Sequence, residues 1–209
     1  DSEDETEALI KSIGSPKIKI VYSTWDTNIR KGGSVLAVET NKALEHIAAD
    51  ADWIFYIQAD EVLHEKYHSS IRQAAEFFLD NKKVEGLLFK YLHFYGTYDY
   101  LLQGRSAYRY ETRIIRNGQG IRSYRDAQGF RKGETKLAVA LIDAYIYHYG
   151  WVKSPQQMKR KRDNVSRFWV EKDEELQKIL ASGDEYDFDD FEAIEKFSGT
   201  HPAIMQKRI

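Results

Sequence analysis

The run Trp53-Ile54-Phe55-Tyr56-Ile57 is the feature of this sequence that most restricts its fold. Consecutive β-branched and aromatic residues without polar alternation are typical of a strand that is covered on both faces of its sheet. Helical apolar patterns precede the run over 34–49 and follow it over 68–81. This order of helix, strand, helix and strand favours an α/β fold in which a mixed, mostly parallel sheet is flanked by helices.

Further elements are predicted on both sides of this run. A short amphipathic helix is expected from Ser2 to Ile13, and a long helical region from Ser154 to about Ile179. Further strands are expected at 17–22, 86–94, 113–116 and 138–147. We therefore expect two parts, an α/β catalytic-type domain over 1–153 and a C-terminal helical extension over 154–209 that packs on it.

Composition limits the classes of partner. The chain has 31 Lys and Arg against 33 Asp and Glu, so its net charge of -2 gives no overall field that would attract nucleic acid. The absence of cysteine excludes disulfide bonds, thiolate metal sites and a cysteine nucleophile. Apolar runs are far shorter than the roughly 20 residues of a membrane helix. We expect no transmembrane segment, no nucleic-acid partner, and a location in the cytoplasm or at the inner membrane surface.

An acidic motif, Gln58-Ala59-Asp60-Glu61, follows the buried strand. In parallel α/β sheets, ligands bind outside the carboxyl ends of the strands. A carboxylate held there can supply an oxygen to Mg²⁺ or Mn²⁺ while diphosphate oxygens complete the octahedron. The alternative is that Asp60 caps the following helix and Glu61 is merely solvated.

A second cluster places His148 after an apolar strand and before Gly150, which permits a turn. A neutral imidazole at this point could complete a metal site with Asp60. A lone histidine among aromatic residues is more often structural. The loop 28–33 adds cations and glycines before a helix, where they could face a nucleotide or a diphosphate.

In order along the chain, several segments resemble glycosyltransferase family 2, the inverting transferases with the GT-A fold. The matching segments are Asp1-Ser2-Glu3-Asp4-Glu5-Thr6, Trp25 with Gly32-Gly33, Asn41-Lys42-Ala43-Leu44, Asp52 through Glu61, and His148-Tyr149-Gly150-Trp151. The likeness covers most of residues 1 to 165. It implies a Rossmann-like sheet and a hexosyltransferase that moves a sugar from a nucleotide-diphospho-sugar donor to a hydroxyl of a glycan, lipid or protein acceptor, assisted by Mn²⁺ or Mg²⁺. The family's first strand would then lie before Asp1.

The resemblance also implies roles for the residues of the acidic motif. Family members have Asp-x-Asp where this chain has Gln58-Ala59-Asp60. Asp60 inherits the role of metal ligand, whereas Gln58 can only hydrogen-bond through its amide. His148 is similar to the additional histidine ligand of some GT-A enzymes, which makes Asp60 and His148 the expected metal pair.

Inverting transfer needs a general base that takes the proton of the attacking hydroxyl. Asp126 lies roughly where related sequences have an acidic residue that faces the acceptor, and Glu111 is the second choice. Asp126 could equally be a surface partner of Arg122 or Arg125. The residues expected to bind the donor are Arg30, Lys31, Gly32, Gly33, Gln58, Arg113, Trp151 and Lys153.

Three other interpretations stay open. The first is a non-catalytic nucleotide- or carbohydrate-binding domain that kept the GT-A fold, which Gln58 favours. The second is a nucleotidyltransferase, although the glycine-rich basic loop that such enzymes carry near the N-terminus is missing. The third is an interaction module around the acidic loop Asp184 to Asp190 and the following Phe191, Ile194 and Phe197, a segment that reads more simply as a docking helix.

Overall fold

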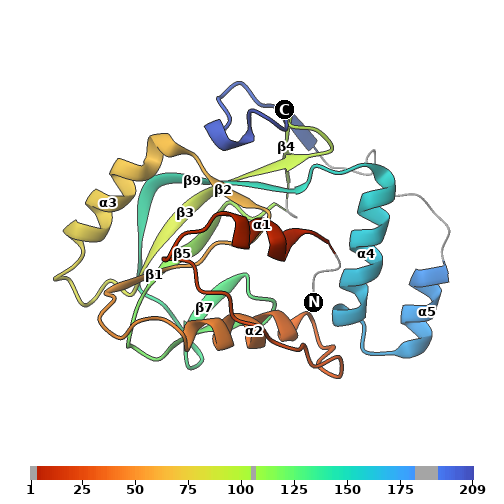
Figure 1. The fold of residues 1–209 in the computed structure, drawn as a ribbon, viewed down its shortest axis with the longest axis horizontal. Coiled ribbons are helices and arrows are strands. Elements are labelled where there is room, and N and C mark those ends of the chain that lie inside the picture. The colour runs from red at the N-terminus through yellow and green to blue at the C-terminus, as the bar shows by residue number, and fades with distance from the viewer. Residues whose placement is uncertain (1–3, 105–106, 182–192) are drawn as a thin grey trace.

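A computed structural model describes residues 4–104, 107–181 and 193–209 as a mixed α/β structure (Figure 1). The helices are α1 (Thr6–Ser12), α2 (Ser34–Leu44), α3 (His68–Phe77), α4 (Pro155–Trp169) and α5 (Asp173–Ala181), with 3-10 turns η1 (Glu65–Tyr67) and η2 (Ala203–Met205). The strands are β1 (Trp53–Phe55), β2 (Glu61–Leu63), β3 (Gly86–Tyr95), β4 (Tyr100–Gln103), β5 (Tyr110–Arg116), β6 (Ile121–Tyr124), β7 (Gly129–Lys132), β8 (Thr135–Lys136), β9 (Val139–Trp151) and β10 (Ala193–Lys196).

A seven-stranded sheet is organised around the long strands β3 and β9. These two strands run parallel, with Leu87 opposite Ala140 and His93 opposite His148. Every other pairing in this sheet that the structure describes is antiparallel. The expectation of flanking helices on a mixed sheet is confirmed, but the expectation of a mostly parallel, Rossmann-like sheet is not. The physical reason is that β3, β4 and β5 follow one another through short connections, which reverse the chain direction.

Several predicted elements are confirmed with shorter or longer bounds. The segments 86–94, 113–116 and 138–147 form β3, β5 and β9. The helical patterns at 34–49 and 68–81 form α2 and α3, each ending several residues early. The apolar run at 53–57 forms only the short β1, whose Phe55 is 40% exposed.

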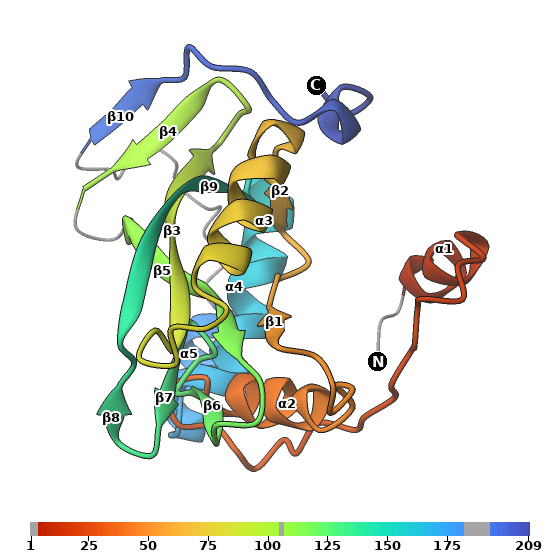
Figure 2. The ribbon, with the colours of Figure 1, turned by 90° about the vertical axis from the view of Figure 1, so that its left-hand side faces the viewer.

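The expected strand at 17–22 is wrong. Residues 18–26 have no regular secondary structure, and Ile18, Val21 and Tyr22 are exposed. No strand within the described parts of the chain pairs with this segment, so its backbone groups have no ladder to join. Figure 2 shows the segment leading to α1, which stands apart from the sheet.

The C-terminal extension is only partly helical. Helices α4 and α5 agree with the expectation, whereas Ala193–Lys196 forms the edge strand β10 against β4, with Ile194 opposite Leu102. The expected docking helix is therefore wrong over this part. Phe191 and the acidic loop 184–190 lie outside the described residues. None of the described helices is long and apolar enough to cross a membrane.

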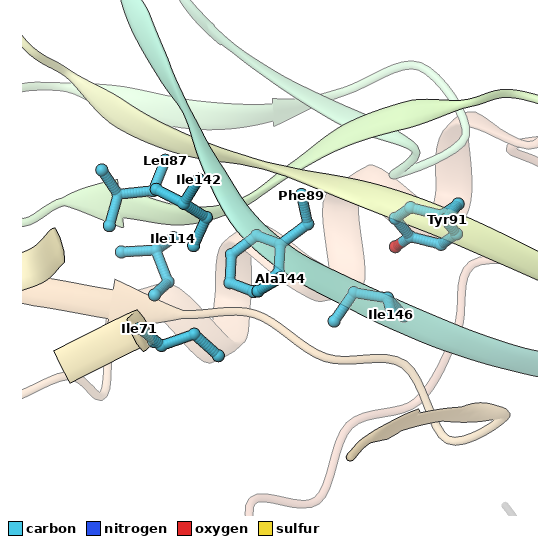
Figure 3. Close-up of a cluster of buried hydrophobic side chains, with 8 residues drawn as sticks. All are labelled: Ile71, Leu87, Phe89, Tyr91, Ile114, Ile142, Ala144 and Ile146. Carbon is cyan, nitrogen blue, oxygen red and sulfur yellow. The ribbon is translucent and has the colours of Figure 1, made fainter. Parts of the chain in front are cut away.

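The core lies on both faces of β3 and β9 because alternate residues of each strand point in opposite directions. On one face α3 contributes Ile71 to a cluster that Figure 3 shows, comprising Leu87, Phe89, Tyr91, Ile114, Ile142, Ala144 and Ile146. On the other face, Phe94 and Tyr147 pack with Met205 of η2. His93 and His148 are the next inward residues after Tyr91 and Ile146, so the strands carry this pair to the end of the first cluster.

Phe89 tests this description of the core. Its side chain is fully buried and stacks on Phe55, so Phe89→Ala is expected to lower the free energy of unfolding by about 3–5 kcal/mol. Phe77→Ala is the matched control, because Phe77 is 79% exposed, and we expect a change under about 0.5 kcal/mol. Urea unfolding of both variants measures the difference, and equal losses would contradict the assigned core.

Candidate functional site

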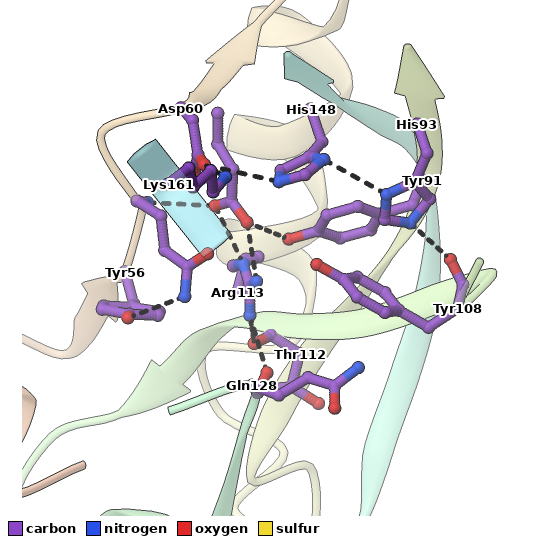
Figure 4. Close-up of polar contacts among 12 residues, drawn as sticks. Tyr56, Asp60, Tyr91, His93, Tyr108, Thr112, Arg113, Gln128, His148 and Lys161 are labelled. Atoms are coloured by element: carbon purple, nitrogen blue, oxygen red, sulfur yellow. Dashed lines mark hydrogen bonds and ion pairs between the residues drawn. The ribbon is translucent and has the colours of Figure 1, made fainter. Parts of the chain in front are cut away.

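Asp60 lies in the turn between β1 and β2, directly before the first residue of β2. Its backbone carbonyl accepts a hydrogen bond of 2.8 Å from the Tyr149 N–H of β9. Its side chain turns toward His148, with 3.6 Å between Asp60 Oδ2 and His148 Nε2 (Figure 4). The alternative that Asp60 caps a helix is therefore not supported, since a strand follows it.

Glu61 holds this turn from inside the protein. Its carboxylate is fully buried and forms a two-pronged ion pair with Arg113, at 2.7 and 3.1 Å. It also accepts hydrogen bonds from the Tyr91 hydroxyl at 2.8 Å and from the Gln58 N–H at 3.0 Å. The alternative of a solvated Glu61 is wrong, because every one of these contacts is made away from water.

A chain of hydrogen bonds orients His148. His93 Nε2 lies 2.9 Å from the backbone carbonyl of Tyr108, which can only accept, so this nitrogen carries the proton. Burial and the neighbouring His148 lower the pKa of His93 to about 4, so His93 is neutral near pH 7 and its Nδ1 is an acceptor. His148 Nδ1 lies 3.2 Å from that acceptor and must donate. His148 Nε2 is therefore the ring nitrogen presented to Asp60.

Gly150 leaves the space in which Asp60 and His148 meet. It lies inside β9 rather than in the turn that its sequence suggested. A Cβ at this position would overlap Asp60 Oδ2 and would lie 2.7 Å from His148 Nε2. Glycine within a strand often marks a close approach of another group, and here the group is the Asp60 carboxylate.

Lys161 of α4 closes the cluster. Its Nζ lies 3.2 Å from Asp60 Oδ2 and 3.0 Å from the carbonyl oxygen of Gly150. It also lies 5.5 Å from the centre of the Trp151 ring. Burial alone would raise the pKa of Asp60, but the hydrogen bonds and charges of His148 and Lys161 outweigh burial and hold that pKa well below its usual range. Asp60 is therefore a permanent anion with a lysine as its counter-ion.

The two candidates for the general base line one pocket. Glu111 of β5 and Asp126 of the β6–β7 hairpin both border an open cavity of about 250 Å³, together with Tyr124, Gln128 and Arg131. No ion pair joins Asp126 to Arg122 or Arg125 in the described residues, so the alternative of a surface ion pair is not supported.

Glu111 has the carboxyl group whose environment is most altered in this pocket. Burial raises its pKa to about 7, with smaller contributions from the Asp126 and Glu61 carboxylates, while Arg113 acts in the opposite direction. A carboxyl group that titrates near pH 7 can exchange a proton with a hydroxyl under ordinary conditions. Perturbed carboxyl groups that line a cavity are candidates for catalysis.

The backbone around Asp126 is strained. Arg125 and Ala127, its two neighbours, have φ values of 54° and 60°, which side chains other than glycine rarely adopt. Asn41 of α2 steadies the hairpin through two hydrogen bonds with the backbone of Ser123. Strain that the surroundings maintain at a pocket is a known feature of functional loops.

Arg113 connects Glu61, in the strand after Asp60, with the hairpin that carries Asp126. Besides holding Glu61, its guanidinium donates a hydrogen bond of 2.9 Å to the backbone carbonyl of Gln128, in the hairpin that carries Asp126. The side chain is fully buried. Arg113 therefore has no surface to offer a donor phosphate in this structure, and its part is to hold the Asp60 turn and the pocket in one arrangement.

The expected donor loop, 28–33, packs on the C-terminal helices. Arg30 pairs with Asp173 of α5, and the N–H of Gly33 donates to the carbonyl of Phe168 at 2.9 Å. Gly33 has a φ of 70°, and a Cβ there would overlap the ring of Trp169. The close approach at this glycine is thus made by Trp169. Gly32 and Lys31 are exposed beside it.

The other expected donor residues surround Asp60 more closely. The Gln58 amide donates to the Tyr56 hydroxyl at 3.2 Å, and Gln58 begins the turn that contains Asp60. Trp151 lies beside Lys161, as given above. Lys153 is half-buried in the connection between β9 and α4. The sequence did not single out His93, Tyr91 or Lys161, because their roles depend on strand pairing and on a helix that packs back.

The donor atoms fit a resident divalent ion only in part. Asp60 Oδ2 and His148 Nε2 face each other, as two ligands of one ion would, but Lys161 already binds the same oxygen. No group of three or more His, Asp or Glu side chains that could hold a metal occurs in residues 4–104, 107–181 and 193–209. An octahedral ion would need most of its ligands from elsewhere.

No protein-family model and no curated protein matches this chain.

Gly150→Ala tests the assembly at Asp60. The new methyl group must push Asp60 or His148 aside, so we expect a loss of about 1–3 kcal/mol in the free energy of unfolding. Gly129→Ala is the control, since its Cβ would make only an ordinary contact at 3.7 Å with Glu111. Thermal and urea unfolding compare the two, and an unaffected Gly150→Ala variant would refute the close approach.

Glu111→Gln tests the environment of Glu111 through the dependence of stability on pH. A carboxyl group whose pKa is raised from 4.5 to about 7 on folding destabilises the protein once it ionises. We therefore expect Glu111→Gln to be more stable than wild type above about pH 7, with the difference vanishing as the pH falls toward 4.5.

Unfolding by urea at a series of pH values measures the difference between Glu111→Gln and wild type. Glu134→Gln, at an exposed turn residue, is the control and should leave the curve unchanged. A constant difference in stability across this pH range would show that the pKa of Glu111 is not raised by folding.

Proposed function

We propose that this protein is an inverting glycosyltransferase, which moves a sugar from a nucleotide-diphospho-sugar to a hydroxyl group of an acceptor. The observation that carries the proposal is that Arg113 holds both Glu61, next to Asp60, and the backbone of Gln128, which borders the Glu111 pocket. Asp60 is an anion with a bound cation, and burial raises the pKa of Glu111 to about 7. The reaction needs a positive charge that stabilises the departing diphosphate. It also needs a base that takes the proton of the acceptor hydroxyl.

The donor side of the proposed site is Asp60 with its neighbours. A departing diphosphate gains negative charge as the bond to the sugar breaks, and a fixed positive charge stabilises that change. The cation at Asp60 supplies this charge, whether it is a divalent ion or the ammonium group of Lys161. Gln58 and Trp151 border the same turn and offer an amide and an aromatic face to the nucleotide sugar.

The acceptor side of the proposed site is the Glu111 pocket. The acceptor oxygen attacks the anomeric carbon from the face opposite the diphosphate, and its proton passes to the Glu111 carboxylate. The bond between that carbon and the diphosphate oxygen breaks, and its electron pair leaves with the diphosphate. Asp126, on the strained hairpin, orients the acceptor by accepting a second hydrogen bond. Glu111 thus replaces Asp126 as the first choice for the general base, because its pKa is raised to about 7.

The competing function is a binding domain that recognises nucleotides or carbohydrates without turnover. It accounts for Asp60 but gives no role to Glu111, a half-buried carboxyl group that destabilises the fold when it ionises. Residues that reduce stability and line a cavity are usually retained for function. A cytoplasmic location belongs to the same proposal, and the lack of cysteine is compatible with it.

Variants of the two acidic groups should separate donor binding from transfer. Asp60→Asn is expected to weaken binding of UDP-, GDP- or dTDP-sugars about ten- to hundredfold, since it removes the charge that holds the cation. Glu111→Gln is expected to keep donor binding and to lower the transfer rate by about 10²–10⁴-fold, as for loss of a general base.

Calorimetry measures donor binding, and release of nucleoside diphosphate in the presence of mixed glycan, lipid and peptide acceptors measures transfer. Asp143→Asn is the matched control, because Asp143 is an exposed carboxylate that pairs with Lys90 on the far edge of β9. Failure of every nucleotide sugar to bind wild type, with and without Mn²⁺, would sink the proposed function. Wild-type transfer by Glu111→Gln would remove Glu111 as the base.

A further inference from the structure

Lys161 occupies the position next to Asp60 that a bound cation would take. Its ammonium group bridges Asp60 Oδ2 and the carbonyl oxygen of Gly150, at 3.2 and 3.0 Å, and Figure 4 shows it beside Asp60. Both partners are oxygen acceptors of the kind that hard cations select. Lys161 lies 101 residues from Asp60 in the sequence, so this contact exists only because α4 returns to the β1–β2 turn and to Gly150 of β9.

The start of α4 fixes Lys161 in place. Ser154 and Gln157 form a capping box, and Pro155 occupies the first turn. One turn later Met158, which is almost completely buried, anchors the helix against the protein. Because both the capping box and Pro155 stabilise the start of α4, Lys161 reaches Asp60 from a rigid helix rather than from a loop.

The ammonium group retains capacity for a ligand. It has three N–H bonds, and within the described residues two oxygen acceptors are assigned to it. The side chain is 29% exposed, so the remaining donor can reach a group that arrives from solvent. A phosphate oxygen is an acceptor that a lysine ammonium group binds as a point charge.

The surrounding charges favour this lysine over a divalent ion. A divalent ion at Asp60 Oδ2 would lie against the ammonium group of Lys161, and like charges at such a distance repel. Gln58, in the same turn, has a neutral amide that donates to the Tyr56 hydroxyl, so it adds no negative charge to offset a double positive one. Asp60 and Lys161 instead neutralise each other's charge, and the remaining N–H of the ammonium group is available to an anionic ligand.

We propose that Lys161 supplies the positive charge that stabilises the donor diphosphate, so that the donor site works without a divalent ion. This inference rests on the proposed function, because it concerns the cation of the same site. The lysine stays in contact with Asp60, which holds it in position, and its free N–H donates to a diphosphate oxygen. The Gly150 carbonyl is the second acceptor that holds the ammonium group, and His148 Nε2 faces the same Asp60 oxygen.

The test is binding of UDP, GDP and dTDP to the full chain by calorimetry, in EDTA and then with Mn²⁺. Wild type is expected to bind one of these nucleotides equally well in both conditions. Lys161→Met is expected to bind it about ten- to hundredfold more weakly in EDTA, because a charge-assisted contact is lost. Lys161→Arg, which keeps the charge, should recover most of the affinity.

Mn²⁺ added to Lys161→Met provides a second arm. With the ammonium group removed, Asp60 and His148 have room for an ion, so Mn²⁺ is expected to restore nucleotide binding to this variant. Lys159→Met is the matched control, because Lys159 belongs to the same helix but pairs with Asp163. Thermal unfolding of each variant shows whether it is folded, and both lysine variants should melt within a few degrees of wild type.

Two results would overturn the inference. One is wild-type binding that disappears in EDTA and returns with Mn²⁺, which would assign the charge to a metal. The other is undiminished binding by Lys161→Met in EDTA. Either result leaves the proposed glycosyltransferase standing, whereas no binding of any nucleotide in either condition removes both the transferase and the role of Lys161.

Discussion

The arrangement of the site depends on the buried ion pair between Glu61 and Arg113. Two charges taken out of water add little net stability, but removing one partner leaves the other unpaired at a cost of about 3–5 kcal/mol. The main role of the ion pair here is to position two parts of the site. Glu61 fixes the turn that holds Asp60, and Arg113 reaches the hairpin that holds Asp126. The β1–β2 turn and the β6–β7 hairpin are thereby linked to each other through the Glu61–Arg113 pair.

The strands could be predicted from sequence better than the sheet. Apolar runs at 86–94 and 138–147 identify β3 and β9, because a buried strand must itself consist mostly of apolar residues. The direction in which strands pair is not local information. The mostly parallel expectation came from the alternation of helices and strands before residue 90, whereas short connections after β3 turn the chain back and produce antiparallel neighbours. The segment 17–22 alternates well, yet alternation cannot supply a partner strand.

Part of the candidate site was visible in sequence and part was not. Asp60 and His148 could be paired in advance because each follows or ends an apolar run, and the structure brings them to 3.6 Å. Arg113 could not be assigned, since a strand arginine looks the same whether it faces solvent or a buried glutamate. Lys161 was hidden among Lys159, Arg160 and Arg162, which together resemble a solvated basic helix. Only the packing of α4 singles out one member of that run.

The return of the chain after β9 changes what counts as the domain. A boundary at residue 153 is natural on sequence grounds, because the long strand ends there and a helix begins. Yet α4 supplies the counter-ion of Asp60, and β10 extends the sheet at its far edge. Helix α4 and strand β10 therefore both contribute to the part of the molecule that precedes residue 153, one at Asp60 and the other at the edge of the sheet. A fragment cut at this boundary would keep the carboxylate and lose the charge that balances it.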